Sequence, residues 1–276
     1  MQPVTQSLFA TFFPSGCRLC NAPLTNLSRL PVCESCLAGM HPIEGAVCAV
    51  CGERLMSPYL VDSDVASSVP SDALCGLCRR VTPSYARAVA YGSYDGGLRE
   101  LIHLLKYQSV RPAADVLGEM LAAAIAKLST NFEQKTILVV PVPLHRSKLR
   151  ERGFNQSELI ARAALKFLHA DGRLRVSPVL KRIRPTKSQI GLTQHQRREN
   201  LRGAFAVINP EEIKGSEILL VDDVVTTGTT VSECARILRR AGASNVWVAS
   251  VGRTLKLGQQ SIAWAQAPKA ALAFGT

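Results

Sequence analysis

The stretch ILLVDDVVTTGTT, residues 218–230, decides the fold. Its first four residues are apolar and predict a buried strand that delivers Asp222 and Asp223 at its carboxyl end. The Thr- and Gly-rich segment behind them leads into an expected helix over residues 230–241, which stops at Gly242. A strand, a short loop and a helix in this order are typical of an α/β sheet, which holds its ligands at the carboxyl ends of its strands.

The loop after the acidic pair has the chemistry of a phosphate site. Backbone N–H groups at a helix N-terminus suit a phosphate dianion, and Gly228 permits close backbone approach. The candidate phosphate ligands are Thr226, Thr227, Gly228, Thr229 and Thr230. Asp222 and Asp223 would accept hydrogen bonds from vicinal ribose hydroxyls directly, or would contact the ribose together with Mg²⁺. The plain alternative is a well-capped helix start without a ligand.

Strand and helix signals alternate around this stretch. We expect strands at residues 86–94, 136–140, 217–221 and 245–251, and further helices at residues 97–107, 113–128 and 157–168. Strands that alternate with helices predict parallel units with right-handed crossovers. The sequence therefore favours an α/β domain with a parallel sheet flanked by helices.

Eight of the nine cysteines lie in four Cys-x-x-Cys pairs before residue 80. Two such pairs complete a tetrahedral shell of four thiolates, which suits a structural zinc ion. Sequential pairing predicts two zinc ions; a cross-braced pairing of the first pair with the third stays open. Thioredoxin-like redox chemistry and an iron–sulfur cluster are less favoured. Cys234 stands alone and is expected in the core. The candidate metal ligands are Cys17, Cys20, Cys33, Cys36, Cys48, Cys51, Cys75 and Cys78.

The composition of the 276 residues narrows the classes of protein and partner. A hydrophobic share of 47% and a charged share of 20% indicate a globular protein. The formal net charge of +12 favours anionic partners, although it can also serve solubility alone. No apolar run is long enough for a membrane span. Residues 1–13 are expected to form a short amphipathic helix, and the cysteine spacing favours a reducing, cytoplasmic location over a disulfide framework.

Several stretches together resemble one family. They are FPSGCRLC (residues 13–20), LIHLLKYQ (101–108), VVPVPLHRSKLRERGFNQSELIA (139–161) and TKSQIGLTQHQRRENLRGAF (186–205). Residues 218–230 resemble the signature of type I phosphoribosyltransferases for phosphoribosyl pyrophosphate (PRPP). With the other stretches, the chain resembles the ComF/GntX family, which joins a zinc ribbon to a phosphoribosyltransferase domain and is linked to DNA uptake in competence. The similarity covers roughly residues 12–253.

The resemblance implies a double zinc ribbon at residues 12–80, a type I phosphoribosyltransferase-like domain at 85–253 and an unassigned tail at 254–276. It implies that Asp222 and Asp223 bind the ribose hydroxyls of PRPP, with Mg²⁺, and that residues 226–230 bind its 5′-phosphate. It also implies a pyrophosphate site on the loop behind Pro143, where basic residues on an extended chain would clamp the oxygens. These residues are Arg146, Lys148, Arg150 and Arg152. A solvated basic loop is the alternative.

Departures from relatives limit the expected chemistry. Hypoxanthine-type salvage enzymes carry an Asp where this chain has Thr226, so no general base follows from the resemblance. The nucleophilic N-terminal Cys of glutamine amidophosphoribosyltransferases is replaced by Met1 and Gln2. Residues 186–205 are expected to form part of a flexible cover, in which His195 is a surface residue.

Two functions remain open at this point. The first is a pentosyltransferase with an unidentified acceptor and unidentified catalytic residues. The second is a binding protein whose zinc ribbons and basic surfaces hold single-stranded DNA or a DNA-uptake protein, with PRPP as a regulatory or vestigial ligand. Purine salvage ranks below both because of Thr226. An oligomer is compatible with either function.

Overall fold

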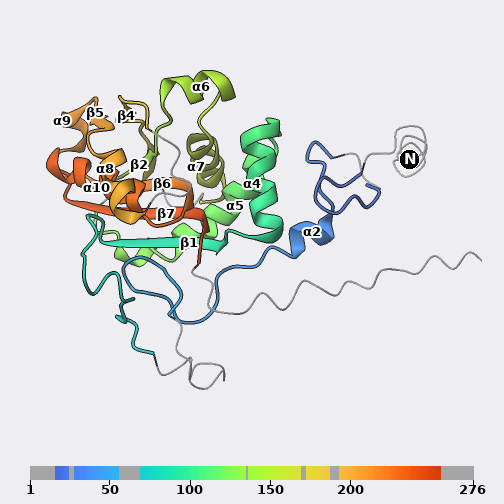
Figure 1. Ribbon diagram of the computed structural model, residues 1–276, viewed down its shortest axis with the longest axis horizontal. Helices are drawn as coiled ribbons and strands as arrows, with labels where there is room; N and C mark the ends of the chain where they lie inside the picture. The colour runs from blue at the N-terminus through green and yellow to red at the C-terminus, as the bar shows by residue number, and fades with distance from the viewer. Residues whose placement is uncertain are drawn as a thin grey trace, which may run out of the picture.

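The computed structural model describes residues 16–24, 28–55, 69–134, 136–168, 172–186 and 193–255. The expected helix at residues 1–13 and residues 256–276 of the tail lie outside these ranges. A five-stranded parallel sheet with the order β1-β7-β6-β2-β3 forms the centre (Figure 1). Its strands are β1 (Arg87–Ser93), β2 (Ile137–Pro141), β3 (Leu174–Val176), β6 (Glu217–Val225) and β7 (Asn245–Arg253). The expected α/β class with a parallel sheet is thereby confirmed.

The central strands are buried on both faces, as the apolar run at residues 218–221 predicts. Leu219 and Val221 belong to a cluster with residues of helices α4 (Gly96–Gln108), α5 (Ala113–Ala126) and α7 (Gln156–Phe167). Ile218 and Leu220 belong to a second cluster that includes α10 (Thr229–Arg240). Because side chains alternate along a strand, each cluster fills one face of the sheet.

The strand with the acidic pair extends beyond its expected end. β6 continues to Val225 and pairs with β7 up to the register Val225↔Arg253. The acidic pair therefore lies within the strand and not behind it. The neighbouring strand supplies hydrogen-bond partners, and this pairing overrides the weak strand preference of Asp.

Shorter elements complete the described part of the chain. Helix α8 (Gln194–Leu201) begins with a capping box in which Thr193 and Gln196 bond each other's backbone N–H groups. It occupies part of the segment expected to be a flexible cover; the side chain of His195 lies outside the described residues. The remaining elements are α2 (Glu34–Ala38), the 3₁₀ turn η1 (Ser129–Asn131), α6 (Arg146–Arg152), β4 (Leu180–Arg182), α8 (Gln194–Leu201), β5 (Phe205–Val207) and α9 (Pro210–Ile213). Strands β4 and β5 form a separate antiparallel pair.

The cysteines form two tetrads, and these confirm the sequential pairing. The first tetrad is Cys17, Cys20, Cys33 and Cys36; the second is Cys48, Cys51, Cys75 and Cys78. Sulfur–sulfur distances are 3.9 Å for Cys17–Cys36, and 3.6 Å for both Cys20–Cys33 and Cys51–Cys75. Zinc–sulfur bonds of about 2.3 Å in a tetrahedron put the sulfurs about 3.8 Å apart. The tetrads therefore fit two structural zinc ions.

The two halves of the cysteine module pack in different places. We call the described residues 16–40 ribbon 1, and the described residues 48–55 and 69–78 ribbon 2. Ribbon 1 contributes Leu30, Val32 and Met40 to the cluster around α4 and α5. Ribbon 2 contributes Cys48, Cys51 and Cys78 to the cluster on the α10 face of the sheet. Both ribbons are thus continuous with the core of the sheet domain.

The chain from ribbon 1 into ribbon 2 also covers one edge of the sheet. The N–H of Ile43 donates to the carbonyl of Tyr91 at 2.6 Å, and the N–H of Ala88 donates to the carbonyl of Val50 at 2.7 Å. Strand β1 lies at the edge of the sheet. Without these bonds, the Tyr91 carbonyl and the Ala88 N–H would be free to pair with another chain. The cysteine module therefore protects the β1 edge. Among the described residues, no helix combines the length and apolar character needed to cross a bilayer.

Candidate functional site

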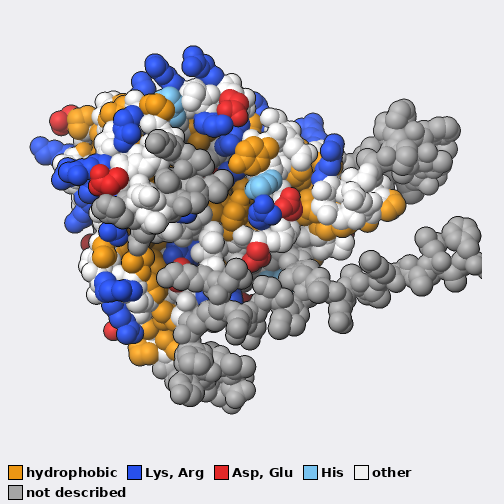
Figure 2. All heavy atoms as spheres, in the orientation of Figure 1, with side chains coloured by type: hydrophobic (Ala, Val, Ile, Leu, Met, Phe, Trp, Pro, Cys, Tyr) orange, Lys and Arg blue, Asp and Glu red, His pale blue; other side chains and the backbone are white. Residues whose placement is uncertain are grey.

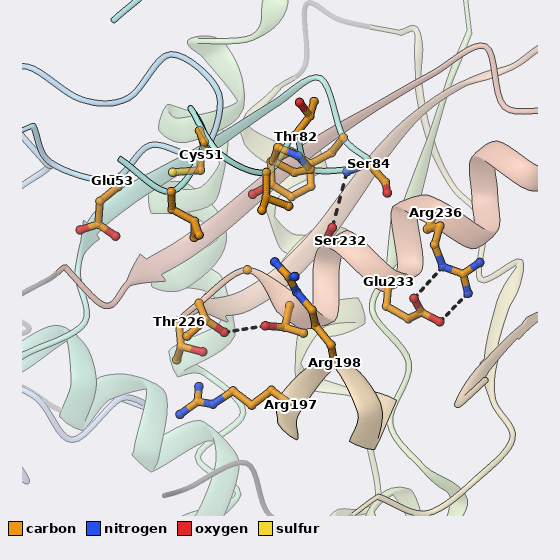
Figure 3. Close-up of a pocket in the computed structure, with 18 of the residues that line it drawn as sticks. Cys51, Glu53, Thr82, Ser84, Arg197, Arg198, Thr226, Ser232, Glu233 and Arg236 are labelled. Carbon is orange, nitrogen blue, oxygen red and sulfur yellow. Dashed lines mark hydrogen bonds and ion pairs between the residues drawn. The ribbon is translucent and has the colours of Figure 1, made fainter. Parts of the chain in front are cut away.

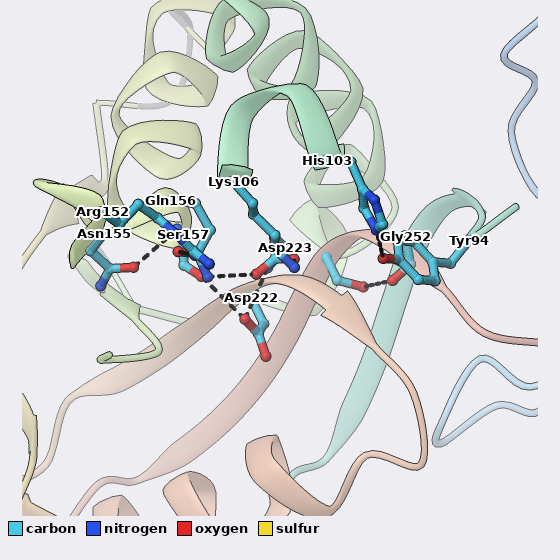
Figure 4. Close-up of polar contacts among 11 residues, drawn as sticks. Tyr94, His103, Lys106, Arg152, Asn155, Gln156, Ser157, Asp222, Asp223 and Gly252 are labelled. Carbon is cyan, nitrogen blue, oxygen red and sulfur yellow. Dashed lines mark hydrogen bonds and ion pairs between the residues drawn. The ribbon is translucent and has the colours of Figure 1, made fainter. Parts of the chain in front are cut away.

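The two carboxylates of the acidic pair have different surroundings (Figure 4). Asp222 is partly exposed and accepts hydrogen bonds from the Ser157 hydroxyl at 3.1 Å and from the N–H of Asp223 at 3.0 Å. Asp223 is buried, forms an ion pair with Lys106 and accepts a bond from Gln156 Nε2 at 2.9 Å. Consecutive residues of a strand point to opposite sides, which explains the difference. Asp222 is the carboxylate that remains open to a ligand.

The electrostatics of the pair follow from this arrangement. Although Asp222 keeps some exposure, desolvation of its carboxyl and the nearby charge of Asp223 raise its pKa to about 8, against the opposing effect of Lys106. Burial opposes the charge on Lys106, but Asp223 holds the pKa of this ammonium above its ordinary value. The Lys106 ammonium therefore keeps its charge beside Asp223, while the pKa of Asp222 lies at about 8.

The phosphate loop, residues 226–230, follows β6 and includes the first two residues of α10. Gly228 has a φ of 74° and caps α10, a left-handed conformation that glycine adopts without strain. Thr226 and Thr227 are exposed, and the hydroxyls of Thr227 and Thr229 lie 2.8 Å apart. The loop therefore places threonine hydroxyls at the N-terminus of α10, a helix of 12 residues, as expected for an anion site.

The phosphate loop lines one side of a cavity of about 960 Å³ (Figure 3). Thr226, Thr227, Gly228 and Thr229 form that side, and Cys51 and Cys78 of ribbon 2 form part of another. The cavity is rich in guanidinium groups, although Arg236 is held by Glu233 through two bonds of 2.6 and 2.7 Å. Its arginines are Arg80, Arg197, Arg198, Arg202, Arg236, Arg240 and Arg253. A concave surface with this charge suits an anion.

The predicted pyrophosphate residues lie on helix α6 and not on an extended loop. Side chains on a helix turn by about 100° per residue, so alternate positions do not face one ligand. Arg146, Lys148 and Arg150 are exposed, and Lys148 pairs with Glu151 at 2.7 Å. The expectation of a row of basic side chains on an extended loop is therefore wrong. His145 caps this helix by accepting from the N–H of Ser147, which explains why the segment coils.

Arg152 is the basic residue of this set that reaches the acidic pair. Its Nη1 donates to Oε1 of Gln156, whose amide in turn donates to Asp223. Its guanidinium also lies over the ring of Tyr107, 5.5 Å from the centroid. Figure 2 shows Lys and Arg side chains gathered along the upper rim, where α6 lies, so the helix as a whole presents a basic surface.

Three residues that contact the acidic pair are not among those predicted from the sequence: Lys106, Gln156 and Ser157. Lys106 carried a usable signal. It continues the apolar face of α4, four residues behind Ile102, where a charge is out of place unless a partner meets it. Gln156 and Ser157 open α7 behind the Asn155 cap and gave no such signal.

Comparison with protein families identifies two parts of the chain. Residues 8–79 match the model described as Double zinc ribbon domain, and residues 168–256 match the Phosphoribosyl transferase domain. The second match includes the acidic pair and the phosphate loop.

Whole-chain comparison finds relatives of similar length. The chain is 32% identical over 244 residues to DNA utilization protein YhgH of Escherichia coli O157:H7, covering 88% of this chain and 98% of the relative. It is 29% identical to Competence protein F of Haemophilus influenzae, covering 80% and 96%. Among solved structures, hypoxanthine-guanine phosphoribosyltransferase from Schistosoma mansoni shows 17% identity and a TM-score of 0.32, over 52% of this chain and 66% of that one.

Proposed function

Since this chain belongs to the ComF/GntX family of phosphoribosyltransferase-like proteins with a double zinc ribbon, we propose that it binds PRPP with Mg²⁺ at the acidic pair and phosphate loop. One observation carries the proposal. A carboxylate on β6 that stays open to a ligand, Asp222, is followed within a few residues by a glycine-containing helix N-terminus that faces an arginine-rich cavity. A sugar phosphate offers hydroxyls to the carboxylate and a phosphate dianion to the helix N-terminus.

Each part of the ligand has a matching group. The 5′-phosphate accepts hydrogen bonds from the backbone N–H groups and hydroxyls of residues 226–230. The ribose hydroxyls donate to Asp222. Asp223 is paired with Lys106 and holds the end of β6 in place below the ligand. Pyrophosphate lies toward the end of α6 that carries Arg152, whose guanidinium contacts Gln156 beside the acidic pair. Mg²⁺ supplies charge neutralisation of the pyrophosphate oxygens when it is bound.

In the transferase form of the proposal, the C1′–oxygen bond to pyrophosphate breaks and an acceptor nucleophile forms the new bond at C1′. Pyrophosphate takes the electron pair, and the basic surface at α6 stabilises its charge. Thr226 offers no carboxylate that could serve the acceptor as a general base.

A titration tests the binding site directly. Isothermal calorimetry with PRPP and Mg²⁺ compares the wild type with Asp222→Asn/Asp223→Asn, and we expect the affinity to fall by at least tenfold, on the order of the loss of a charge-assisted hydrogen bond. Unchanged affinity in the double variant would place PRPP elsewhere. Release of labelled pyrophosphate from PRPP with a panel of bases and amines tests for transfer, and silence across a broad panel would speak for a binding role alone.

A second candidate is single-stranded DNA, or a protein of DNA uptake, at the cavity between ribbon 2 and the phosphate loop. The names of the relatives refer to DNA utilization and competence, and the seven arginines that line the cavity favour phosphate contacts. DNA affinity should fall steeply with salt and weaken in Arg198→Ala, whereas Arg162→Ala, an exposed ion-pair residue on α7, serves as control. Binding that does not depend on salt would exclude this candidate.

The proposed setting is the reducing cytoplasm. All nine cysteines are free of disulfide bonds, and eight of them form the two tetrads. Thiolate ligands of zinc persist in a reducing compartment, where they are protected from oxidation to disulfides. Fractionation of cells that produce the protein tests the assignment, and recovery outside the cytoplasm would contradict it.

A further inference from the structure

Arg253 links the second tetrad to the sheet. It is the last residue of β7 and only 4% of its surface is exposed. Its Nη2 lies 3.2 Å from Oε2 of Glu53 and 3.6 Å from Sγ of Cys51, both in ribbon 2. A buried guanidinium needs such partners, because an unpaired charge in the core is costly. The side chain of Arg253 is therefore held by ribbon 2, including one of its metal ligands.

The backbone of the same residue holds the start of the phosphate loop. Arg253 pairs with Val225, the last residue of β6, and the N–H of Thr254 donates to the carbonyl of Val225 at 3.0 Å. Val225 immediately precedes Thr226. One residue thus has its side chain on a cysteine of the tetrad and its backbone beside Val225, the residue that precedes the loop.

A second contact runs in parallel. Tyr85 is 5% exposed and packs in the cluster that contains Cys48, Cys51 and Cys78. Its hydroxyl lies 3.2 Å from the point that a Cβ on Gly228 would occupy. Next to it, the N–H of Ser84 lies 3.5 Å from Oγ of Ser232 in the first turns of α10. Ribbon 2, together with Ser84 and Tyr85, therefore packs against the phosphate loop and the start of α10.

The first tetrad has no comparable connection among the described residues. Ribbon 1 packs in the cluster of α4 and α5, and the Tyr91 hydroxyl donates to the carbonyl of Met40 at 3.0 Å. This cluster fills the opposite face of the sheet from α10. Loss of the first tetrad should therefore leave the loop in place.

We propose that Arg253 is a positioning residue that couples the second tetrad to the phosphate loop, so that filling of this tetrad by zinc sets the affinity of the loop for a phosphate dianion. The proposal rests on the phosphate-binding role proposed above for residues 226–230. Zinc bound by this tetrad would hold Cys51 in a fixed position relative to the other three cysteines. Ribbon 2 would then keep Arg253 and Tyr85 in place. Without zinc, Arg253 loses a fixed partner and the β6–β7 end that carries the loop becomes mobile.

The experiment uses the full chain and two measurements. Hydrogen–deuterium exchange of the peptide with residues 226–230 reports loop order, and calorimetric titration with inorganic phosphate and with PRPP·Mg²⁺ reports affinity. In Arg253→Met we expect about tenfold faster exchange and about tenfold weaker phosphate binding, with two zinc ions retained. Arg253→Lys keeps the charge without the fork of donors and should fall between Arg253→Met and the wild type.

The two tetrads supply a matched comparison. Cys51→Ser should lower the zinc content to one per chain and loosen the loop as Arg253→Met does, whereas Cys20→Ser should lose one zinc and leave the loop as in the wild type. Equal loosening by Cys20→Ser, or an unchanged loop in Arg253→Met, would overturn the coupling. Should Cys51→Ser fail to fold, the two Arg253 variants decide, because they remove no metal ligand. If the wild type binds neither phosphate nor PRPP while exchange differs as expected, the link from the tetrad to loop order stands, whereas its effect on phosphate affinity and the PRPP proposal both fail.

Discussion

At the residue scale, the two carboxylates of the acidic pair have different roles, because one is buried and the other is partly exposed. Asp223 is part of the core through Lys106 and Gln156, and Asp222 keeps access to a ligand. Two adjacent carboxylates on a strand would repel each other if both were free, and the Lys106 ammonium offsets that repulsion. The two positions should therefore respond to mutation in opposite ways.

Asp223→Asn should destabilise the protein by about 3 kcal/mol, because it leaves the largely buried Lys106 ammonium without its ion-pair partner. Asp222→Asn should change stability little and weaken PRPP binding. Urea denaturation with calorimetric titration separates the two effects. The double variant Lys106→Met/Asp223→Asn is the control, since removal of both charges should recover much of the lost stability. Equal stability losses at positions 222 and 223 would contradict this division.

The raised pKa of Asp222, about 8, makes ligand binding depend on pH. Below that pKa the carboxyl holds a proton, which must leave before Mg²⁺ binds or ribose hydroxyls find a full acceptor. Affinity for PRPP·Mg²⁺ should therefore rise with pH by up to about tenfold per unit, and level off above the pKa. Titrations from pH 7 to 9 check this, with Asp222→Asn as reference for the titration of PRPP itself. The same slope in both proteins would exclude Asp222 as its source.

At the element scale, the junction of β6 and α10 depends on one glycine. Gly228→Ala forces an L-residue to a φ of 74° and puts its Cβ 3.2 Å from the Tyr85 hydroxyl. Gly215→Ala is a matched control, because Gly215 has the same φ of 74° with nothing within 4 Å of the added Cβ. We expect the control to cost about 1 kcal/mol of stability and to leave phosphate binding intact. Gly228→Ala should cost more and also weaken phosphate binding; thermal denaturation and titration with phosphate measure both.

Helix α6 should act through its end rather than along its length. Arg152 contacts Gln156 and Tyr107 beside the acidic pair, whereas Lys148 is paired with Glu151 on the exposed surface. Arg152→Ala should therefore weaken pyrophosphate binding by about tenfold or more, the loss of a bidentate cation, and Lys148→Ala by much less. Titration with pyrophosphate and Mg²⁺ at two salt concentrations measures the difference. A larger effect at Lys148 would move the pyrophosphate site to the outer face of α6.

The element pattern was predictable where it depended on local sequence. The apolar periodicity of residues 97–107 and 113–128 corresponds to α4 and α5, and residues 245–251 lie within β7. Helix α6 was missed because alternating basic residues carry no apolar periodicity, and its start is set by a His145 cap. Strand β3 was missed because its three residues are held in place by pairing with β2.

At the scale of the whole molecule, the cysteine module packs as an integral part of the sheet domain. Ribbon 2 shares the α10 face of the sheet, and the chain that leads to it covers the free edge of β1. A metal module with its own small core would leave the sheet intact when removed. Here its removal should expose part of the sheet.

Metal analysis of the purified protein should give about two zinc ions per chain. Prolonged treatment with a strong chelator should then speed hydrogen exchange at Ala88, whose N–H donates to Val50 of ribbon 2. The amide of Ala86, which donates to Val246 within the sheet, is the internal reference and should exchange more slowly. A single zinc ion, or equal protection of Ala88 with and without zinc, would contradict this account.

The sequence by itself determined the family, the parallel α/β class, the four cysteine pairs, and the strand–loop–helix with its acidic pair. Each of these is a pattern of neighbours in the chain, and local physics interprets such patterns. Only the tertiary structure decided that Asp223 faces Lys106, that Arg152 alone of its set reaches the site, and that Arg253 meets Cys51 across 202 positions. Those contacts depend on how the sheet stacks its strands and on which face ribbon 2 covers, and burial makes them selective because a charge in the core persists only beside its partner.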